Sequence, residues 1–222
     1  HRLRDDFIES GHRILTSGFR SDSQVRLHPG IVSMQEALRR IKDRMVPDLI
    51  LLIDDSQPLS FTGIESVDVP TAWYAVDTHL HLTWHRECAK LFDFVFVAQK
   101  DFAAQFADGP IGNHITWLPL YCNPRRDRKL GLQKTHEVCF VGSLNKDRNP
   151  SRVRLIEALS GRVPLYVARG GYTEVFNRSK IVFNQSANND VNFRTFEAMG
   201  CGSFLLTEKV ENGLSDLFTD GT

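Results

Sequence analysis

Arg194 and Glu197 are the side chains whose types and spacing most strongly suggest a ligand site. They lie three residues apart, after a polar loop (residues 184–192) and before an apolar strand. Side chains three apart in a helix are neighbours on one face, and Asn189 or Asp190 is available as the N-cap. A helix N-terminus suits a diphosphate, and a carboxylate one turn later can accept hydrogen bonds from ribose hydroxyls. The pattern predicts a nucleotide pocket, although polar loops also precede helices in α/β proteins that bind no nucleotide.

A second candidate set begins where an apolar run ends at Val141. Gly142 and Ser143 follow that run, and Arg152 comes shortly after them. Glycine lets a backbone approach a phosphate closely, and a nearby cation can neutralise it. Taken alone, the same residues also fit an ordinary glycine turn with surface cations.

In the first half of the chain, Asp77 and His79 stand where an apolar run ends. Histidine is the side chain most readily tuned to act as a base near neutral pH, and Asp77 either orients His79 or is itself the base. Polar residues at strand ends are also ordinary loop chemistry. The spacing of His81 and His85 suits a metal on a helix, but no third ligand stands at a convincing position, so we expect no metal site.

These residues need a scaffold that brings strand ends together. Apolar runs of strand length alternate with helix-like segments, and the basic stretch 123–129 between them is interpreted as a linker. We expect an α/β protein with two Rossmann-like domains facing across a cleft, residues 1–130 and 131–222, truncated at both ends. The expected strands span residues 13–17, 49–53, 71–76, 93–98, 115–120, 137–141, 164–168, 181–183 and 203–207.

Composition excludes several classes of protein. The chain has 222 residues, and 27 basic side chains balance 27 acidic ones, which argues against a nucleic-acid backbone as partner. No apolar run approaches the roughly 18 residues of a membrane span. The four cysteines form no Cys-x-x-Cys pair and are expected to be reduced. These features predict a cytoplasmic protein with no integral membrane segment.

The segment 196–202 carries a family resemblance. It reads Phe-Glu-Ala-Met-Gly-Cys-Gly and is followed by an apolar strand. This sequence resembles the donor-binding signature of glycosyltransferases of the GT-B fold, in the C-terminal domain of the group 1 type, and more narrowly the CgeB-like group. The similarity is densest over residues 136–221 and weaker in the first half, where 77–79 and 117–119 agree with it.

The resemblance implies roles for several residues. Glu197 matches the glutamate that holds the donor ribose, and the loop of Gly142 and Ser143 would face the donor diphosphate together with Arg152. The Asp-Val-Asn-x-Arg run of the CgeB-like pattern is matched by residues 190–194.

Within that run, Asp190, Asn192 and Arg194 are the candidate donor-binding side chains. Arg194 would either pair with Asp190 or touch phosphate. The chain departs from many GT-B enzymes at Asn189, where they carry a second glutamate. That departure puts transfer from the large retaining families in doubt.

The resemblance implies a metal-independent glycosyltransferase with a nucleotide-diphosphate sugar as co-substrate and no other cofactor. The second half would bind the donor, and the first half would activate a hydroxyl of a sugar, protein or small-molecule acceptor, with His79 and Asp77 as the catalytic candidates. Two alternatives stay open: a nucleotide-sugar epimerase on the same scaffold, and a non-catalytic nucleotide-sugar-binding module.

Overall fold

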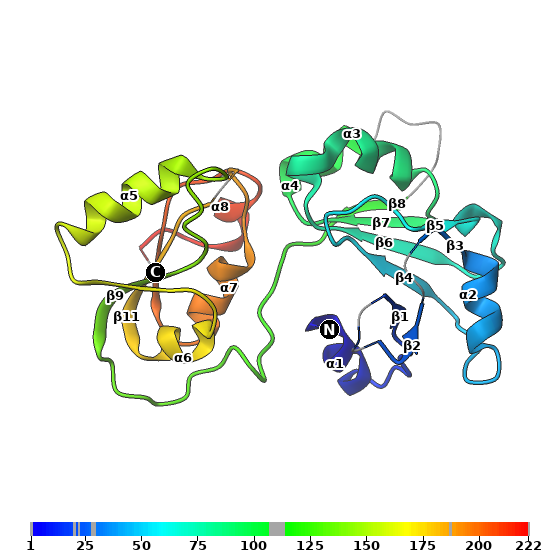
Figure 1. The fold of residues 1–222 in the computed structure, drawn as a ribbon, viewed down its shortest axis with the longest axis horizontal. Coiled ribbons are helices and arrows are strands. Elements are labelled where there is room, and N and C mark those ends of the chain that lie inside the picture. Colours follow the sequence, from blue (N-terminus) through cyan, green and yellow to red (C-terminus); the bar gives the residue numbers. More distant parts are fainter. Residues whose placement is uncertain are drawn as a thin grey trace. The chain divides into compact units, whose positions relative to one another are not determined.

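The chain forms two compact units, residues 1–119 (unit 1) and 120–222 (unit 2), in a computed structural model (Figure 1). The structure describes residues 2–19, 21, 23–27, 30–106, 114–186 and 188–221. Both units are α/β, and their strands pair in parallel. The expected Rossmann-like class of fold is confirmed at this level.

Unit 1 is built on a four-stranded parallel sheet with the order β4-β6-β7-β8. The strands are β4 (Ile50–Ile53), β6 (Thr71–Ala75), β7 (Phe94–Val97) and β8 (His114–Trp117). All five residues of β6 are buried, as expected for a central strand covered on both faces. The connections contain α3 (Thr78–Ala89), which lies over the sheet in Figure 1, and α4 (Lys100–Ala103). These four strands lie where the sequence predicts them.

The remaining elements of unit 1 are short. They are α1 (Arg2–Glu9), β1 (Ser17–Gly18), β2 (Val25–Arg26), β3 (Val32–Ser33), α2 (Met34–Ile41), β5 (Phe61–Thr62) and the 3-10 turns η1 (Ile64–Ser66) and η2 (Ala104–Phe106). The strand predicted over 13–17 is wrong, because only Ser17 of that range joins a strand, β1. A single short apolar run does not determine where a two-residue parallel pair forms.

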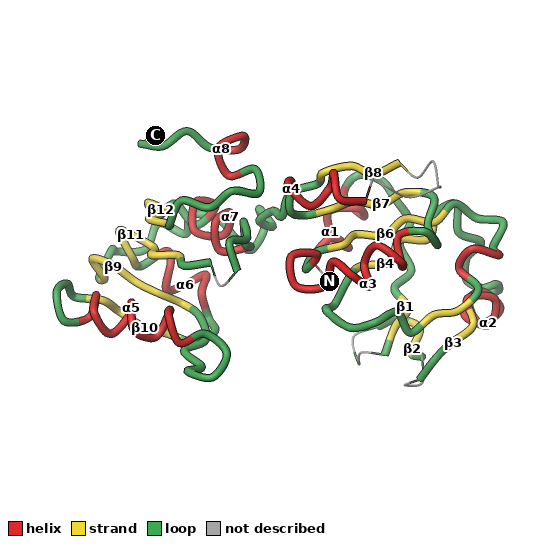
Figure 2. The backbone as a smooth tube through the Cα atoms, turned by 90° about the horizontal axis from the view of Figure 1, so that it is seen from above, coloured by secondary structure: helices red, strands yellow, loops and turns green. Residues whose placement is uncertain are grey.

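Unit 2 has its own parallel sheet, with the order β10-β9-β11-β12 (Figure 2). In chain order the elements are β9 (His136–Val141), α5 (Pro150–Ser160), β10 (Leu165–Ala168), α6 (Tyr172–Asn177), β11 (Ser179–Asn184), α7 (Phe193–Gly200), β12 (Phe204–Thr207) and α8 (Leu214–Leu217). The order reverses at β9, because β10 lies on one side of it and β11 on the other. Open parallel sheets bind ligands at the carboxyl ends of strands beside such a reversal.

The stretch 123–129, interpreted from the sequence as a linker, is packed within unit 2. Asp127 is buried, and its carboxylate accepts hydrogen bonds from the Asn123 backbone (2.8 Å) and the Tyr172 hydroxyl (2.7 Å). The Asn177 amide donates to the Arg128 carbonyl (3.0 Å). This segment therefore forms part of the same unit as β9 to α8.

Gly200, at the end of α7, allows that packing. A Cβ built at Gly200 would lie 2.6 Å from the backbone oxygen of Asp127. Gly200→Ala is expected to lower the free energy of unfolding of unit 2 by about 1–3 kcal/mol, because backbone atoms must move apart. Urea unfolding followed by far-UV circular dichroism measures this change.

Gly161→Ala is the matched control, since its Cβ would meet nothing closer than 3.7 Å. All three tryptophans, at 73, 84 and 117, lie in unit 1, so their fluorescence reports that unit separately. An equal loss of stability in both variants would contradict the close packing at Gly200.

Candidate functional site

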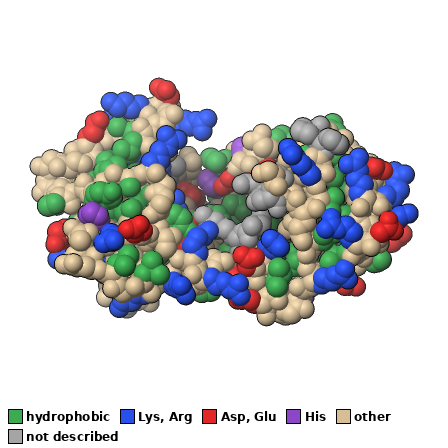
Figure 3. Space-filling model, turned by 60° about the horizontal axis from the view of Figure 1, so that its bottom comes forward, with side chains coloured by type: hydrophobic (Ala, Val, Ile, Leu, Met, Phe, Trp, Pro, Cys, Tyr) green, Lys and Arg blue, Asp and Glu red, His purple; other side chains and the backbone are tan. Residues whose placement is uncertain are grey.

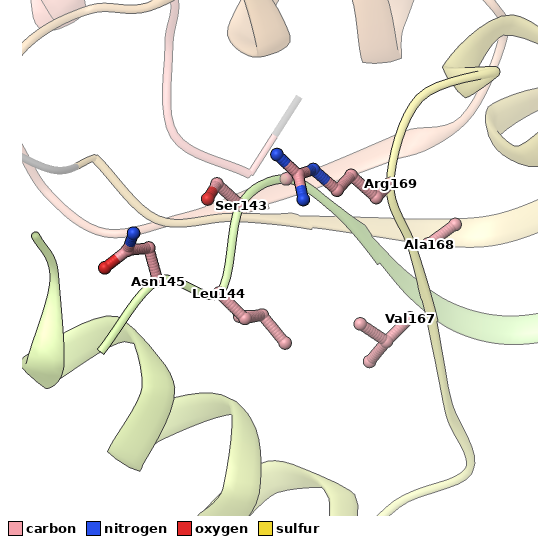
Figure 4. Close-up of a pocket in the computed structure, with 7 residues that line it drawn as sticks. Ser143, Leu144, Asn145, Val167, Ala168 and Arg169 are labelled. Atoms are coloured by element: carbon pink, nitrogen blue, oxygen red, sulfur yellow. The ribbon is translucent and has the colours of Figure 1, made fainter. Parts of the chain in front are cut away.

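Unit 2 contains a pocket of about 420 Å³ at the carboxyl ends of β9 and β10 (Figure 4). Ligand sites for small molecules commonly enclose about 300–1,000 Å³. The lining residues come from the loop after β9 and from the end of β10: Gly142, Ser143, Leu144, Asn145, Val167, Ala168 and Arg169. The pocket therefore includes the glycine and serine singled out from the sequence.

The pocket lining mixes polar and apolar groups, with Leu144 and Val167 as its larger apolar side chains and a cation at its edge. Leu144 and Val167 extend toward one another in Figure 4, and 38% and 39% of their surfaces are exposed. The guanidinium of Arg169 reaches over the loop toward Ser143 (Figure 4). Within the part of the chain that the structure describes, Arg169 makes no hydrogen bond or ion pair. Two apolar side chains beside this cation suit a flat ring that carries an anionic group.

Gly142 leaves room for the Phe140 ring beside its loop. A Cβ at Gly142 would lie 2.7 Å from the Phe140 ring, and the Gly142 N–H donates to the Ala168 carbonyl (3.1 Å). The loop after β9 is thereby held against the end of β10. This arrangement keeps Ser143 exposed at the pocket.

Arg152 lies between two loops. Its guanidinium donates to the Gln185 side chain (2.9 Å) and carbonyl (2.8 Å), and lies 3.5 Å from the Ser143 carbonyl. Burial lowers the pKa of Arg152, although an arginine stays protonated. Arg152 thus braces the loops after β9 and β11, and its donors are engaged by protein oxygens.

Helix α7 begins later than the sequence suggests. Asn192 is its N-cap, and the Asn192 side chain accepts the Arg194 N–H (3.0 Å). The expected cap at Asn189 or Asp190 is wrong. Asn189 has a left-handed backbone (φ 56°), and the Asp190 carboxylate accepts the Ser186 hydroxyl (2.6 Å). Both side chains therefore belong to the loop before the helix.

Glu197 is fully buried and paired with two arginines. Its carboxylate accepts a hydrogen bond from Arg194 and lies 3.9 Å from the Arg126 guanidinium. Of the two partners proposed for Arg194, Asp190 is not used among the described residues, and Glu197 takes its place. A ribose could reach this carboxylate only if an arginine moved.

The Tyr172 ring lies between the Arg194–Glu197 pair and the Arg126–Asp127 pair. It lies 4.6 Å from the Arg194 guanidinium and 5.4 Å from that of Arg126. Burial and the hydrogen bond to Asp127 raise the pKa of the Tyr172 hydroxyl, and the Asp127 carboxylate raises the pKa of Arg126. Arg194 also donates to the Val141 carbonyl (3.3 Å), at the end of β9. The network therefore extends to the last residue before the Gly142 loop.

Sequence reasoning missed Arg126, Arg169 and the role of Tyr172. Arg169 directly precedes a Gly-Gly pair at the end of a predicted strand, which is a usable signal. Arg126 gave no such signal, because it lies in a basic stretch that resembles a linker.

Asp77 and His79 belong to unit 1. Asp77 follows β6, and its carboxylate accepts the Ser56 hydroxyl. His79 is half-buried on the first turn of α3, and its Nδ1 has no hydrogen-bond partner among the described residues. Asp77 therefore does not orient His79 through a direct contact.

A buried histidine lies beside this pair. His85 is fully buried, its Nδ1 lies 3.1 Å from the Thr78 hydroxyl, and its Nε2 lies 3.5 Å from the buried Asp54 carboxylate. The Trp73 and Trp84 rings pack against it, with centroids 4.7 and 4.0 Å away. Burial lowers the pKa of His85 to about 4 and raises that of Asp54.

Comparison with known families places the unit 2 site in context. Residues 141–222 match a family model described as glycosyl transferase-like. This glycosyltransferase-like segment begins at the last residue of β9 and contains Gly142, Arg169 and Glu197. Among curated proteins, none matches the chain at a significant level.

The described residues show neither a metal-ligand cluster nor a membrane-spanning helix. Within the described ranges, no three His, Cys, Asp or Glu side chains gather as metal ligands, and no helix is long and apolar enough to cross a bilayer. On the face drawn in Figure 3, Lys and Arg side chains are interspersed with Asp and Glu.

Acid is expected to destabilise unit 1 through His85. The folded-state pKa of about 4 lies below the ordinary 6.5, so the unfolded chain binds the proton more readily. The contribution of His85 to stability is present above pH 6.5 and is lost as the pH falls toward 4, by about 2 kcal/mol between pH 7 and pH 5. Urea unfolding followed by tryptophan fluorescence measures it.

His85→Gln removes this titration and should flatten the slope between pH 7 and pH 5. Asp54 acts in the opposite direction at lower pH, because its raised pKa favours proton uptake by the folded state. A wild-type slope that the variant retains would mean that His85 is not the group responsible.

Glu197→Ala is expected to lower the stability of the glycosyltransferase-like segment. It leaves Arg194 without its carboxylate partner, while Arg126 keeps its pairing with Asp127. Because both guanidiniums are partly exposed, the expected cost is about 1–2 kcal/mol. The control is Glu174→Ala, whose side chain is 66% exposed and pairs with Arg178. Equal urea midpoints for the two variants by circular dichroism would show that the Glu197 pair is not stabilising.

Proposed function

We propose that the protein is a glycosyltransferase that moves a sugar from a nucleotide-diphosphate sugar to an acceptor hydroxyl. The observation that carries this proposal is the pocket within the glycosyltransferase-like segment. It has nucleotide-compatible size, the apolar side chains of Leu144 and Val167, and the Arg169 guanidinium, which has no hydrogen-bond or ion-pair partner among the described residues. The proposal includes a two-domain GT-B arrangement and membership of the CgeB-like group, with units 1 and 2 as the domains.

In this proposal unit 2 binds the donor. The base lies between Leu144 and Val167, and the diphosphate lies near the backbone of Ser143 and the guanidinium of Arg169. Ribose hydroxyls would bind Glu197 once the diphosphate has drawn Arg194 away from it, since arginine binds phosphate and carboxylate oxygens alike. The arginines supply the positive charge that stabilises the departing diphosphate, so no metal is assigned.

Acceptor activation is assigned to unit 1. Asp77 takes the proton of the acceptor hydroxyl, with His79 as the neighbouring polar group. The acceptor oxygen then forms a bond to the anomeric carbon of the donor sugar. The bond from that carbon to the diphosphate breaks, and its electron pair leaves with the nucleoside diphosphate.

The donor site is tested by calorimetric titration of nucleoside diphosphates and monophosphates into the wild type and into Arg169→Ala. A diphosphate is expected to bind, and the variant should lose about tenfold in affinity because one charge-assisted contact is removed. Nucleoside monophosphates should lose less. Arg162→Ala is the control, because Arg162 is equally exposed and does not line the pocket.

Donor consumption separates the enzyme from a binding module. Bound nucleotide sugar that is never converted to nucleoside diphosphate, with water or any acceptor, would leave the epimerase, which changes the bound sugar itself, and the non-catalytic module. If none of the nucleotides tested binds, both the enzyme and the nucleotide-sugar-binding module are ruled out.

A further inference from the structure

We propose that Ser56 is a positioning residue that holds the Asp77 carboxylate in place for proton transfer. The proposal rests on the proposed function, in which Asp77 is the base. Three locally unfavourable features lie together at the carboxyl ends of β4 and β6: an unused helix cap, a left-handed serine and a buried carboxylate.

The first departure is at the start of α3. Asp77 occupies the N-cap position, where an aspartate normally accepts a backbone N–H of the first turn. Its side chain makes no such bond and accepts the Ser56 hydroxyl instead. The carboxylate is therefore directed away from the helix end that it would ordinarily stabilise.

The second departure is the backbone of Ser56 itself, which is left-handed (φ 63°). The other non-glycine residues with positive φ in the described part of the chain are Asn189 and Asn212, and asparagine tolerates this region well. Serine has no such advantage. Its N–H donates to the Asp54 carboxylate (2.7 Å), which fixes the conformation that delivers the hydroxyl to Asp77.

The third departure is the burial of Asp54. Besides Ser56, its carboxylate accepts the N–H groups of Val76 (3.1 Å) and Asp77 (2.8 Å). The Nε2 of His85 lies 3.5 Å from this carboxylate and is a fully buried atom without a hydrogen bond among the described residues. Asp54 thus ties the ends of the two strands together through backbone contacts, with a neutral histidine at its side.

A different residue at position 56 would make the local structure more stable with the same backbone. Glycine at 56 would relieve the left-handed conformation, and Asp77 would then be free to cap α3. Local departures of this kind persist where a site requires them. All three act on the position of one carboxylate, and Ser56 is the residue that touches it.

In the transfer step, the Ser56 hydroxyl donates to one Asp77 oxygen and leaves the other as the proton acceptor. The acceptor hydroxyl proton passes to that oxygen as the new bond to the anomeric carbon forms and the nucleoside diphosphate leaves. Ser56 does not touch the reacting atoms.

The test variant is Ser56→Gly, in which positioning and structural roles predict opposite results. A positioning role predicts an unchanged or higher melting temperature together with at least a tenfold lower rate of diphosphate release. The probes are uridine diphosphate glucose and guanosine diphosphate mannose, with water as acceptor. The KM for the donor should stay the same, because unit 2 binds it.

A double-mutant cycle shows whether Ser56 acts through Asp77. Asp77→Asn should lower the rate, and adding Ser56→Gly to that variant should lower it no further. Ser10→Ala is the control, since Ser10 is exposed and its hydroxyl donates to the Asp6 carbonyl, far in sequence from Asp77. Its rate should equal that of the wild type.

Several outcomes overturn the inference. An unchanged rate in Ser56→Gly, additive losses in the double variant, or a rate loss accompanied by a fall in melting temperature would each do so while leaving the glycosyltransferase proposal intact. Failure of the wild type to release diphosphate from any donor would overturn both, which distinguishes the two failures.

Discussion

The buried Glu197 carboxylate is the constraint on which the arrangement of unit 2 depends. A carboxylate that is removed from water must be neutralised, and here Arg194 and Arg126 do so from opposite directions in the chain. Arg126 comes from the segment before β9 and Arg194 from the start of α7. Glu197, their shared partner, therefore holds the segment 123–129 against α7. Gly200 allows the close contact between α7 and the backbone of Asp127.

Unit 1 contains a buried carboxylate of a different kind. Asp54 is held by backbone N–H groups and lies beside a neutral histidine, so burial raises its pKa, whereas no full positive charge faces it among the described groups. The Glu197 pair contributes stability by matching charges. The Asp54 arrangement fixes the position of its neighbours through backbone hydrogen bonds, without that gain.

The sequence predicted the sheets well, because continuous apolar runs bounded by polar residues identify buried parallel strands such as β4 and β6. It also found Gly142 and the Arg194–Glu197 spacing, since both depend on residues close in the chain. Partners such as Arg126 and Tyr172 were missed because they approach Glu197 from separate elements. The cap of α7 was misplaced because several consecutive polar residues can each cap a helix, and tertiary contacts choose between them.

The distribution of the arginines at the unit 2 site has a consequence for ligand charge. Arg126, Arg152 and Arg194 already donate to protein oxygens, and only Arg169 makes no such contact in the described structure. A diphosphate that binds here meets one available cation, and it gains a second only by taking Arg194 from Glu197. That exchange would free the Glu197 carboxylate while the anion becomes paired. Recognition of the phosphates and of the ribose would then be linked steps, because the same guanidinium serves both groups in turn.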